Sequence, residues 1–160
     1  MSINKNVQDT HISSQLKVLH GSLISIASAM NRPQRDEAMI KEAGIPLDRA
    51  LFPLLVGIEK LGPIGVVEIA DRVGRDYTTV SRQVSKLEEL GLVHRESSAA
   101  DRRIRMASVT AKGKGMTDLV DAARERMGRK IFASWEQTEM DDLVRLIRKF
   151  ADALDRLDES

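Results

Sequence analysis

The chain has 160 residues, a net charge of +1 and no cysteine. A chain of this length can bury a core without cross-links, and the lack of cysteine excludes disulfides, thiolate metal sites and thiol-based redox sensing. No apolar run approaches the ~18 residues that span a bilayer, and residues 1–10 lack the apolar core of a signal peptide. We therefore expect a soluble, cytoplasmic protein with no membrane partner.

The N-terminal part of the chain is predicted to be helical. Apolar residues recur at steps of three and four over residues 11–31, which predicts an amphipathic helix. A short helix is expected over residues 35–43, where Gly44 ends it. We expect residues 11–44 to form part of a dimerisation platform.

The next helix is expected over residues 47–61, with Pro46 opening it and Gly62 ending it. Pro53 lies inside this range and should kink the helix or leave part of its hydrogen-bond ladder open. The sequence leaves open whether such a kink serves packing or a hinge.

The centre of the chain has the spacing of a helix-turn-helix. A short helix is expected over residues 66–73, a turn at Gly74, and a longer helix over residues 76–90 that Gly91 closes. A small residue at position 70 lets the two helices approach, and a glycine at 74 permits the positive φ of a tight turn.

Two strands, residues 92–96 and 104–109, are expected to follow, joined by a polar, basic loop. Two strands cannot stand alone, so they must pack on the preceding helices. Thr110 is expected to cap a long helix that runs to about Phe132, and Thr138 with Asp141 resembles a capping box at the start of the last helix. The fold class predicted is mainly α with a small two- to three-stranded β wing.

The helix over residues 76–90 has two chemically different faces. Val80, Val84 and Leu87 form the stripe expected to be buried. The opposite face carries short hydroxyls suited to phosphates and long cations suited to base edges: Tyr77, Thr78, Ser81, Arg82, Ser85 and Lys86. From Arg72 to Arg105 there are eight basic and five acidic residues. This charge favours a polyanionic partner, although an ordinary solvated surface can carry the same charges.

The run from Asp76 to Val93, DYTTVSRQVSKLEELGLV, resembles the recognition helix of the MarR family (multiple antibiotic resistance regulators). The segment from Asp101 to Thr110, DRRIRMASVT, resembles that family's wing signature, with Val109 where the family has leucine. The resemblance covers roughly residues 45–116, and the flanking helices match only in length and placement.

The resemblance implies a winged helix-turn-helix domain over residues 45–110 and dimerisation helices over residues 11–44 and 111–158. It implies a homodimeric transcriptional regulator, more often a repressor, that binds a roughly palindromic double-stranded DNA operator. Arg82 would be the leading base contact, and the wing loop, residues 97–103, would reach the minor groove. Taken together, the DNA-binding residues expected are Arg75, Tyr77, Thr78, Thr79, Ser81, Arg82, Ser85, Lys86, Asp101, Arg102, Arg103 and Arg105.

Within the wing, Arg102 is the side chain expected to enter the minor groove, because arginine favours narrow, electronegative grooves. Asp101 and Arg103 are expected to pair and hold the loop in shape. The family also implies a small aromatic or phenolic effector bound between the platform and the DNA-binding lobe. Trp135 could line such a pocket or pack in a core, and the residues leave both open.

Other functions fit the sequence less well. No phosphate loop, nucleophile elbow or histidine-based metal motif is present, so we expect no enzymatic activity, no cofactor and no metal. His11 and His20, nine positions apart on one helix, point to opposite faces. The alternative function is a winged-helix protein-interaction module that does not bind DNA, and the basic residues at 82, 86 and 102 argue against it. The apolar terminal helices could also pack on their own chain rather than in a dimer.

Overall fold

A computed structural model describes residues 3–158, and the side chains of residues 9–157 within that range. The chain divides into two units, one ending at Val120 and one beginning at Asp121. The elements in chain order are α1 (Ile3–Met30), α2 (Pro33–Ala43), α3 (Phe52–Leu61), β1 (Ile64–Gly65), α4 (Val66–Val73), α5 (Tyr77–Glu89), β2 (Val93–Ser97), β3 (Arg105–Val109), α6 (Ala111–Ile131) and α7 (Gln137–Asp158).

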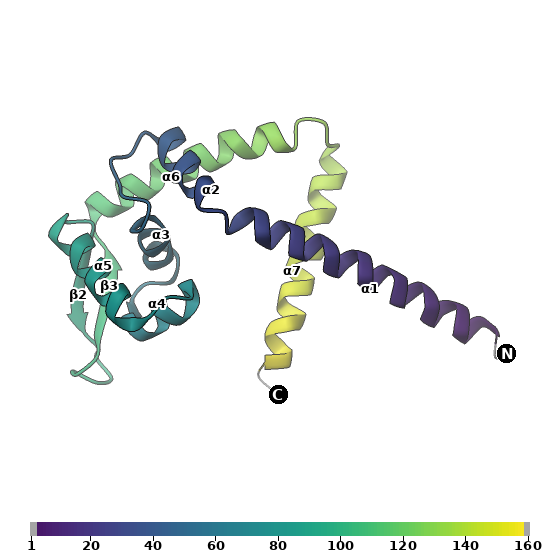
Figure 1. The fold of residues 1–160 in the computed structure, drawn as a ribbon, viewed down its shortest axis with the longest axis horizontal. Coiled ribbons are helices and arrows are strands. Elements are labelled where there is room, and N and C mark those ends of the chain that lie inside the picture. The colour runs from purple at the N-terminus through teal and green to yellow at the C-terminus, as the bar shows by residue number, and fades with distance from the viewer. Residues whose placement is uncertain (1–2, 159–160) are drawn as a thin grey trace. The chain divides into compact units, whose positions relative to one another are not determined.

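The described residues are mostly helical with one small antiparallel sheet (Figure 1), which confirms the predicted fold class. The strands lie in the order β1-β3-β2. Ile64 pairs with Ala107 between β1 and β3, and Val93 pairs with Val109 between β2 and β3. The two-residue strand β1 just before α4 supplies the third strand that the sequence allowed.

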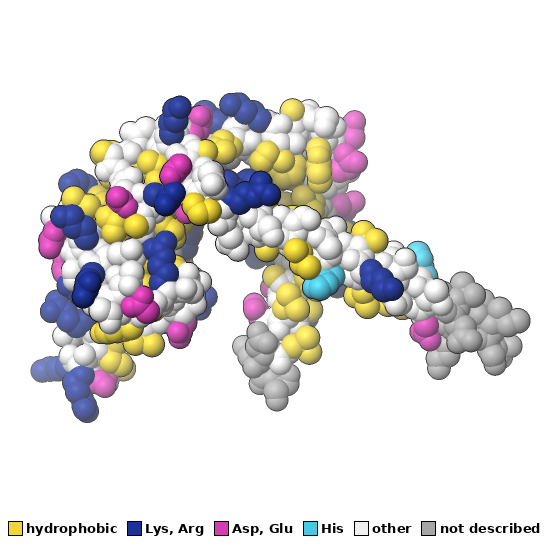
Figure 2. Space-filling model, in the orientation of Figure 1, with side chains coloured by type: hydrophobic (Ala, Val, Ile, Leu, Met, Phe, Trp, Pro, Cys, Tyr) yellow, Lys and Arg dark blue, Asp and Glu magenta, His cyan; other side chains and the backbone are white. Residues whose placement is uncertain are grey.

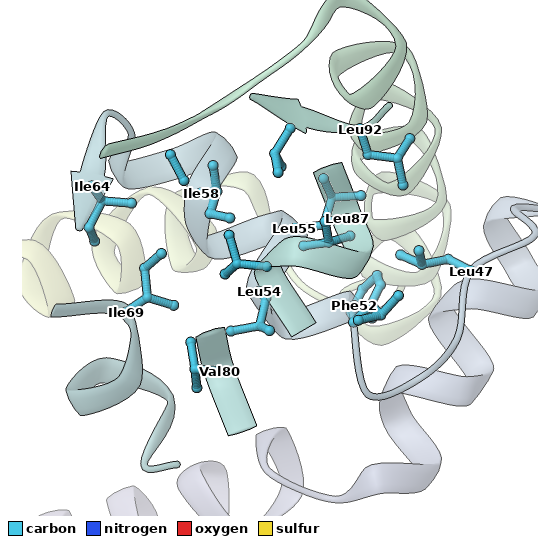
Figure 3. Packing of buried hydrophobic residues seen from close by; sticks show 14 of the residues in the cluster. Leu47, Phe52, Leu54, Leu55, Ile58, Ile64, Ile69, Val80, Leu87 and Leu92 are labelled. Carbon is cyan, nitrogen blue, oxygen red and sulfur yellow. The ribbon is translucent and has the colours of Figure 1, made fainter. Parts of the chain in front are cut away.

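One hydrophobic core holds the first unit together. Leu54, Leu55 and Ile58 of α3 are almost wholly buried, and they pack with Val80 and Leu87 of α5 in one cluster (Figure 3). The cluster also takes in buried residues from the sheet and the helices on either side. Burial of a large aliphatic side chain contributes about 1.5–3 kcal/mol, so α5 is held firmly from its inner face.

The predicted helix over residues 47–61 is wrong at its start, since α3 begins only at Phe52. Leu47 is buried in an irregular segment, and the Asp48 carboxylate accepts a hydrogen bond from Ala50 N at 2.7 Å, which favours a turn there. Pro53 therefore lies in the first turn of α3. Backbone N–H groups in a first turn have no acceptor within the helix, so the N–H that proline lacks is not needed there. The predicted kink does not arise.

Two caps illustrate how local chemistry sets helix ends. At the start of α6, Thr110 Oγ1 accepts a hydrogen bond from Gly113 N at 3.0 Å, which confirms Thr110 as the cap. The predicted capping box of Thr138 and Asp141 is wrong by two residues. Instead, Glu136 N donates to Glu139 Oε2 at 2.9 Å, because α7 already begins at Gln137.

Both terminal helices carry large apolar side chains that are exposed to solvent. In α1 these include Leu16, Val18 and Met30, each more than half exposed, and in α7 they include Val144 and Leu157. The helix over residues 11–31 was predicted too short, since α1 begins at Ile3. No helix in the described range combines the length and hydropathy needed to cross a membrane.

Candidate nucleic-acid interface

The helix-turn-helix is built from α4, a three-residue turn and α5. Gly74 ends α4 with a φ of 65°, a left-handed conformation that glycine adopts without strain. Arg75 N then donates to Ala70 O at 3.0 Å, which closes the turn. Ala70 and Ile69 are buried, so the small side chain at 70 lies at the contact that the sequence predicted.

Asp76 caps the N-terminus of α5. Its carboxylate accepts hydrogen bonds from Thr79 N at 2.9 Å and Thr79 Oγ1 at 2.5 Å. The Thr79 hydroxyl and the Thr79 N–H together hold the pKa of the Asp76 carboxyl below its usual value of 3.8. The Thr79 hydroxyl, predicted to face DNA, is therefore engaged in the cap.

We predict that Asp76→Ala lowers the thermal stability of the chain at neutral pH and that the loss shrinks in acid. Because the folded-state pKa of Asp76 is lowered, its contribution is fully present above the usual pKa of 3.8 and is lost as the pH falls through the folded value. The check is thermal unfolding of both proteins over a range of pH. Asp71→Ala is the control, because the exposed carboxylate of this α4 aspartate has no hydrogen bond or ion pair within the described residues. An unchanged gap between wild type and Asp76→Ala down to about pH 2 would contradict the prediction.

The inner and outer faces of α5 separate as expected. Val80, Val84 and Leu87 are wholly buried. On the other face Tyr77, Thr78, Arg82 and Lys86 are exposed, whereas Thr79, Ser81 and Ser85 are partly buried.

The polar side chains on the outer face of α5 differ in how far they are engaged. Among the described residues no hydrogen bond or ion pair is recorded for the Arg82 guanidinium. Lys86 Nζ lies 3.1 Å from Glu89 Oε2, and Ser85 Oγ donates to Ser81 O at 3.0 Å. Of the two basic side chains on the outer face of α5, Arg82 is therefore the one whose N–H groups are available to a ligand.

Arg75, also predicted to contact DNA, is held within the protein. Its Nη1 donates to Ala50 O at 2.7 Å and to Gln83 Oε1 at 3.0 Å, and its side chain is partly buried. These two bonds tie the turn before α5 to the segment before α3 and to the middle of α5. The guanidinium supports the position of α5 in this structure.

The wing is the loop between β2 and β3. Ser98 N donates to Ile104 O at 2.7 Å, and Arg103 N donates to Asp101 Oδ1 at 3.0 Å. Arg103 Nε also lies 3.5 Å from Asp101 Oδ1, so the predicted pair is present.

Three arginines with different surroundings lie in the wing loop and at the start of β3. Arg102 is exposed, and no partner is recorded for it in the described part of the chain. The Arg103 side chain is 94% exposed, and Arg105 Nη2 donates to Arg95 O at 3.2 Å. Figure 2 shows Lys and Arg side chains gathered around the wing at the lower left.

Arg95, in the middle of β2, is a residue whose role the sequence reasoning missed. Its side chain is only 19% exposed and contacts Glu88 and Ser85 of α5. In the sequence, the acidic Glu88 and the basic Arg95 lie on either side of the Gly91 turn. The sequence did not show that this turn brings the two side chains into contact.

A cavity of about 840 Å³ lies within the first unit, beside the start of α2 and the helix-turn-helix. Its wall combines apolar side chains such as Met30 and Phe52 with the cations Arg49 and Arg75. Asp36 also lines it, and burial raises the pKa of the Asp36 carboxyl while the charges of Arg75 and Arg49 oppose the rise. The lining of the cavity is therefore mixed, with apolar and charged side chains facing the same space.

Within residues 9–157 no group of three or more His, Asp and Glu side chains lies close enough together to hold a metal ion.

These elements define a winged helix-turn-helix protein. The family described as HVO_A0114 matches residues 49–108. The chain is 27% identical over 103 residues to an uncharacterized HTH-type transcriptional regulator, YxaD of Bacillus subtilis, and the match covers 64% of this chain and 72% of YxaD. YxaD is described as a transcriptional regulator, which agrees with the prediction of no catalytic function.

Solved structures of MarR-type proteins share the fold. A MarR family protein from Bacillus stearothermophilus superposes with a TM-score of 0.71 at 20% identity, covering 89% of this chain and 97% of that one. A structure of MarR itself gives a TM-score of 0.65 at 23% identity, covering 86% and 91%. The chain thus has the MarR-type winged-helix fold, which confirms at the level of the fold the resemblance found in its sequence.

Proposed function

We propose that this protein is a sequence-specific DNA-binding transcriptional regulator, a repressor that binds a pseudo-palindromic operator as a homodimer. The observation that carries the proposal is the pair of exposed arginines with no recorded partner, Arg82 on α5 and Arg102 on the wing, on elements anchored by one core. In the proposed complex α5 enters the major groove and the wing lies along the adjacent minor groove.

The proposed roles follow from the chemistry of each side chain. Arg82 donates two hydrogen bonds to guanine O6 and N7, which a lysine could not do with the same geometry. Arg102 enters the minor groove. The remaining predicted residues contact phosphates or other base edges, or support those that do: Arg75, Tyr77, Thr78, Thr79, Ser81, Ser85, Lys86, Asp101, Arg103 and Arg105.

A dimer follows from the proposed operator and from the exposed apolar side chains of α1 and α7. A two-fold operator has half-sites about 34 Å apart and needs two copies of α5 at that spacing. Exposed apolar residues such as Leu16 and Val144 would be covered by the second copy. We propose that residues 11–44 and 111–158 form this platform.

We further propose that a small aromatic or phenolic effector releases the protein from DNA. The cavity beside the helix-turn-helix supports this, since Phe52 and Met30 offer an apolar wall and Arg75 places a positive charge there, next to α5. A change of a few ångströms in the spacing of the two α5 helices would weaken operator binding.

The proposal is tested by titrating the purified protein against short duplexes from its source genome, including the DNA upstream of its own gene. We expect one palindromic fragment to be retained over bulk DNA, with affinity falling steeply as salt rises. A duplex with a single half-site should bind much more weakly than the palindrome. The same fragments are then tested with candidate aromatic acids and phenols.

Two outcomes would overturn parts of this proposal. Binding to no fragment above bulk DNA, by protein refolded free of small molecules, would exclude the regulator and favour a protein-interaction module. An operator affinity that responds to no effector would leave a constitutive DNA-binding protein and exclude release by a ligand.

A further inference from the structure

Arg95 of β2 joins the wing to α5. Its Nε and Nη2 donate to Glu88 Oε2 at 2.9 and 2.6 Å, and its Nη2 also lies 3.2 Å from Ser85 Oγ. Two donors on one carboxylate oxygen hold the guanidinium more strictly than a single contact could. The side chain therefore connects a wing strand to the last two turns of α5.

The pair is better shielded than the other ion pairs of this surface. The side chains of Arg95 and Glu88 are 19% and 35% exposed, whereas the Lys86–Glu89 pair on the same helix is 57% and 67% exposed. The hydrogen bonds from Arg95 hold the pKa of the Glu88 carboxyl below its usual value, so Glu88 is ionised at neutral pH. Partial burial reduces screening by water and salt, which strengthens this pair relative to exposed ones.

The location of the pair matters because the two proposed DNA-contacting arginines lie on different elements. Arg82 lies on α5 and Arg102 on the wing loop, and the chain passes from one element to the other through the turn at Gly91. Buried Val93 and Ala107 anchor the base of the sheet. Among the described residues, Arg95 carries the side-chain hydrogen bonds recorded between β2 and α5.

We propose that Arg95 is a positioning residue, which with Glu88 sets the angle of the wing relative to α5 so that both grooves are contacted at once. Arg95 would not itself touch DNA. This inference rests on the proposed DNA-binding function.

A direct phosphate contact by Arg95 is the competing explanation, and the acidic partner separates the two. Glu88→Gln removes a negative charge from a DNA-binding surface, so electrostatics alone would raise affinity for all DNA. If Arg95 positions the wing, the same change loosens it and lowers affinity for the operator. The two explanations predict opposite signs.

We therefore expect Glu88→Gln to lower operator affinity by about tenfold while affinity for unrelated DNA stays the same or rises. The salt dependence of operator binding should keep its slope, since no phosphate contact is lost. Glu89→Gln is the matched control, because it makes the same charge change one residue away in an exposed pair, and it should not lower operator affinity. The double variant Glu88→Arg, Arg95→Glu keeps the net charge and should recover part of the loss.

Higher operator affinity in both glutamine variants, or a salt slope smaller by about one in Arg95→Gln, would overturn the proposal in favour of a phosphate contact. Thermal unfolding of each variant shows whether it is folded at the temperature of the assay.

A second measurement needs no DNA. The chain has no cysteine, so spin labels can be attached at Thr78→Cys on α5 and Ala99→Cys on the wing, with labelled chain diluted into unlabelled chain. We expect the distance distribution between the labels to widen in Glu88→Gln and not in Glu89→Gln. An unchanged distribution would overturn the proposal even if the protein binds an operator. Failure of the wild type to bind any operator would instead remove the proposed function.

Discussion

Replacing Arg82 by alanine is expected to reduce the preference of this protein for its operator by about 1–3 kcal/mol. Arg82 is exposed on α5, with no recorded partner in the described structure, and the helix behind it is held by the wholly buried Val80, Val84 and Leu87. The variant should therefore fold normally and lose the bidentate contact alone. The measurement is the ratio of operator affinity to affinity for unrelated DNA at fixed salt.

Arg82→Lys is the informative control, since it keeps the positive charge and removes the planar guanidinium group with its paired N–H donors. If Arg82 contacts guanine, lysine should recover little of the operator preference, whereas a phosphate contact would tolerate it. Arg102→Ala should behave differently, with the largest loss at A·T-rich steps flanking the half-sites. An Arg82→Ala protein with full operator preference would exclude this residue as the base contact.

Gly113→Ala is expected to destabilise the fold by about 1–3 kcal/mol or more. A Cβ on Gly113 would lie 2.0 Å from Leu92 O and 2.6 Å from Val109 Cγ2. The Leu92 carbonyl is part of the backbone and accepts a hydrogen bond from Thr110 N at 3.0 Å, so it cannot move without disturbing the start of α6. The close approach of α6 to the base of the wing requires a glycine at this position.

Gly115→Ala, two residues further along α6, is the matched control with the opposite expected sign. A Cβ there would meet no atom within 4 Å, and alanine in an exposed helix is more stable than glycine by about 0.5–1 kcal/mol. Denaturant unfolding at one protein concentration measures both variants. If Gly113→Ala proves as stable as Gly115→Ala, the prediction is contradicted, and α6 does not approach the Leu92 carbonyl as closely as described.

Several features of this fold could be predicted from the sequence alone. The apolar spacing of α5 predicted its buried and exposed faces, because a helix of 3.6 residues per turn places Val80, Val84 and Leu87 on one side whatever surrounds it. Gly74 and Thr110 were predicted as a turn and a cap for the same reason, since their roles depend on the backbone within three or four residues.

The sequence left open the features that distant parts of the chain decide. Pro53 was expected to kink a helix, but the preceding segment with buried Leu47 is irregular, and the helix starts beside the proline instead. Arg75 was predicted as a DNA contact from local pattern alone, and the fold adds that Ala50 O, 25 residues earlier, accepts one of its hydrogen bonds. Side-chain partners so far apart in sequence cannot be derived from local periodicity.

By itself, the sequence determined the class of this protein: the helix-turn-helix spacing, the two faces of α5, the basic wing and the family likeness. Those features are local, being set by backbone periodicity and residue type within short windows. Only the tertiary structure decided which cations are free and which are engaged. Long, flexible side chains such as those of Arg75 and Arg95 find partners by packing across the fold, whereas Arg82 and Arg102 remain exposed.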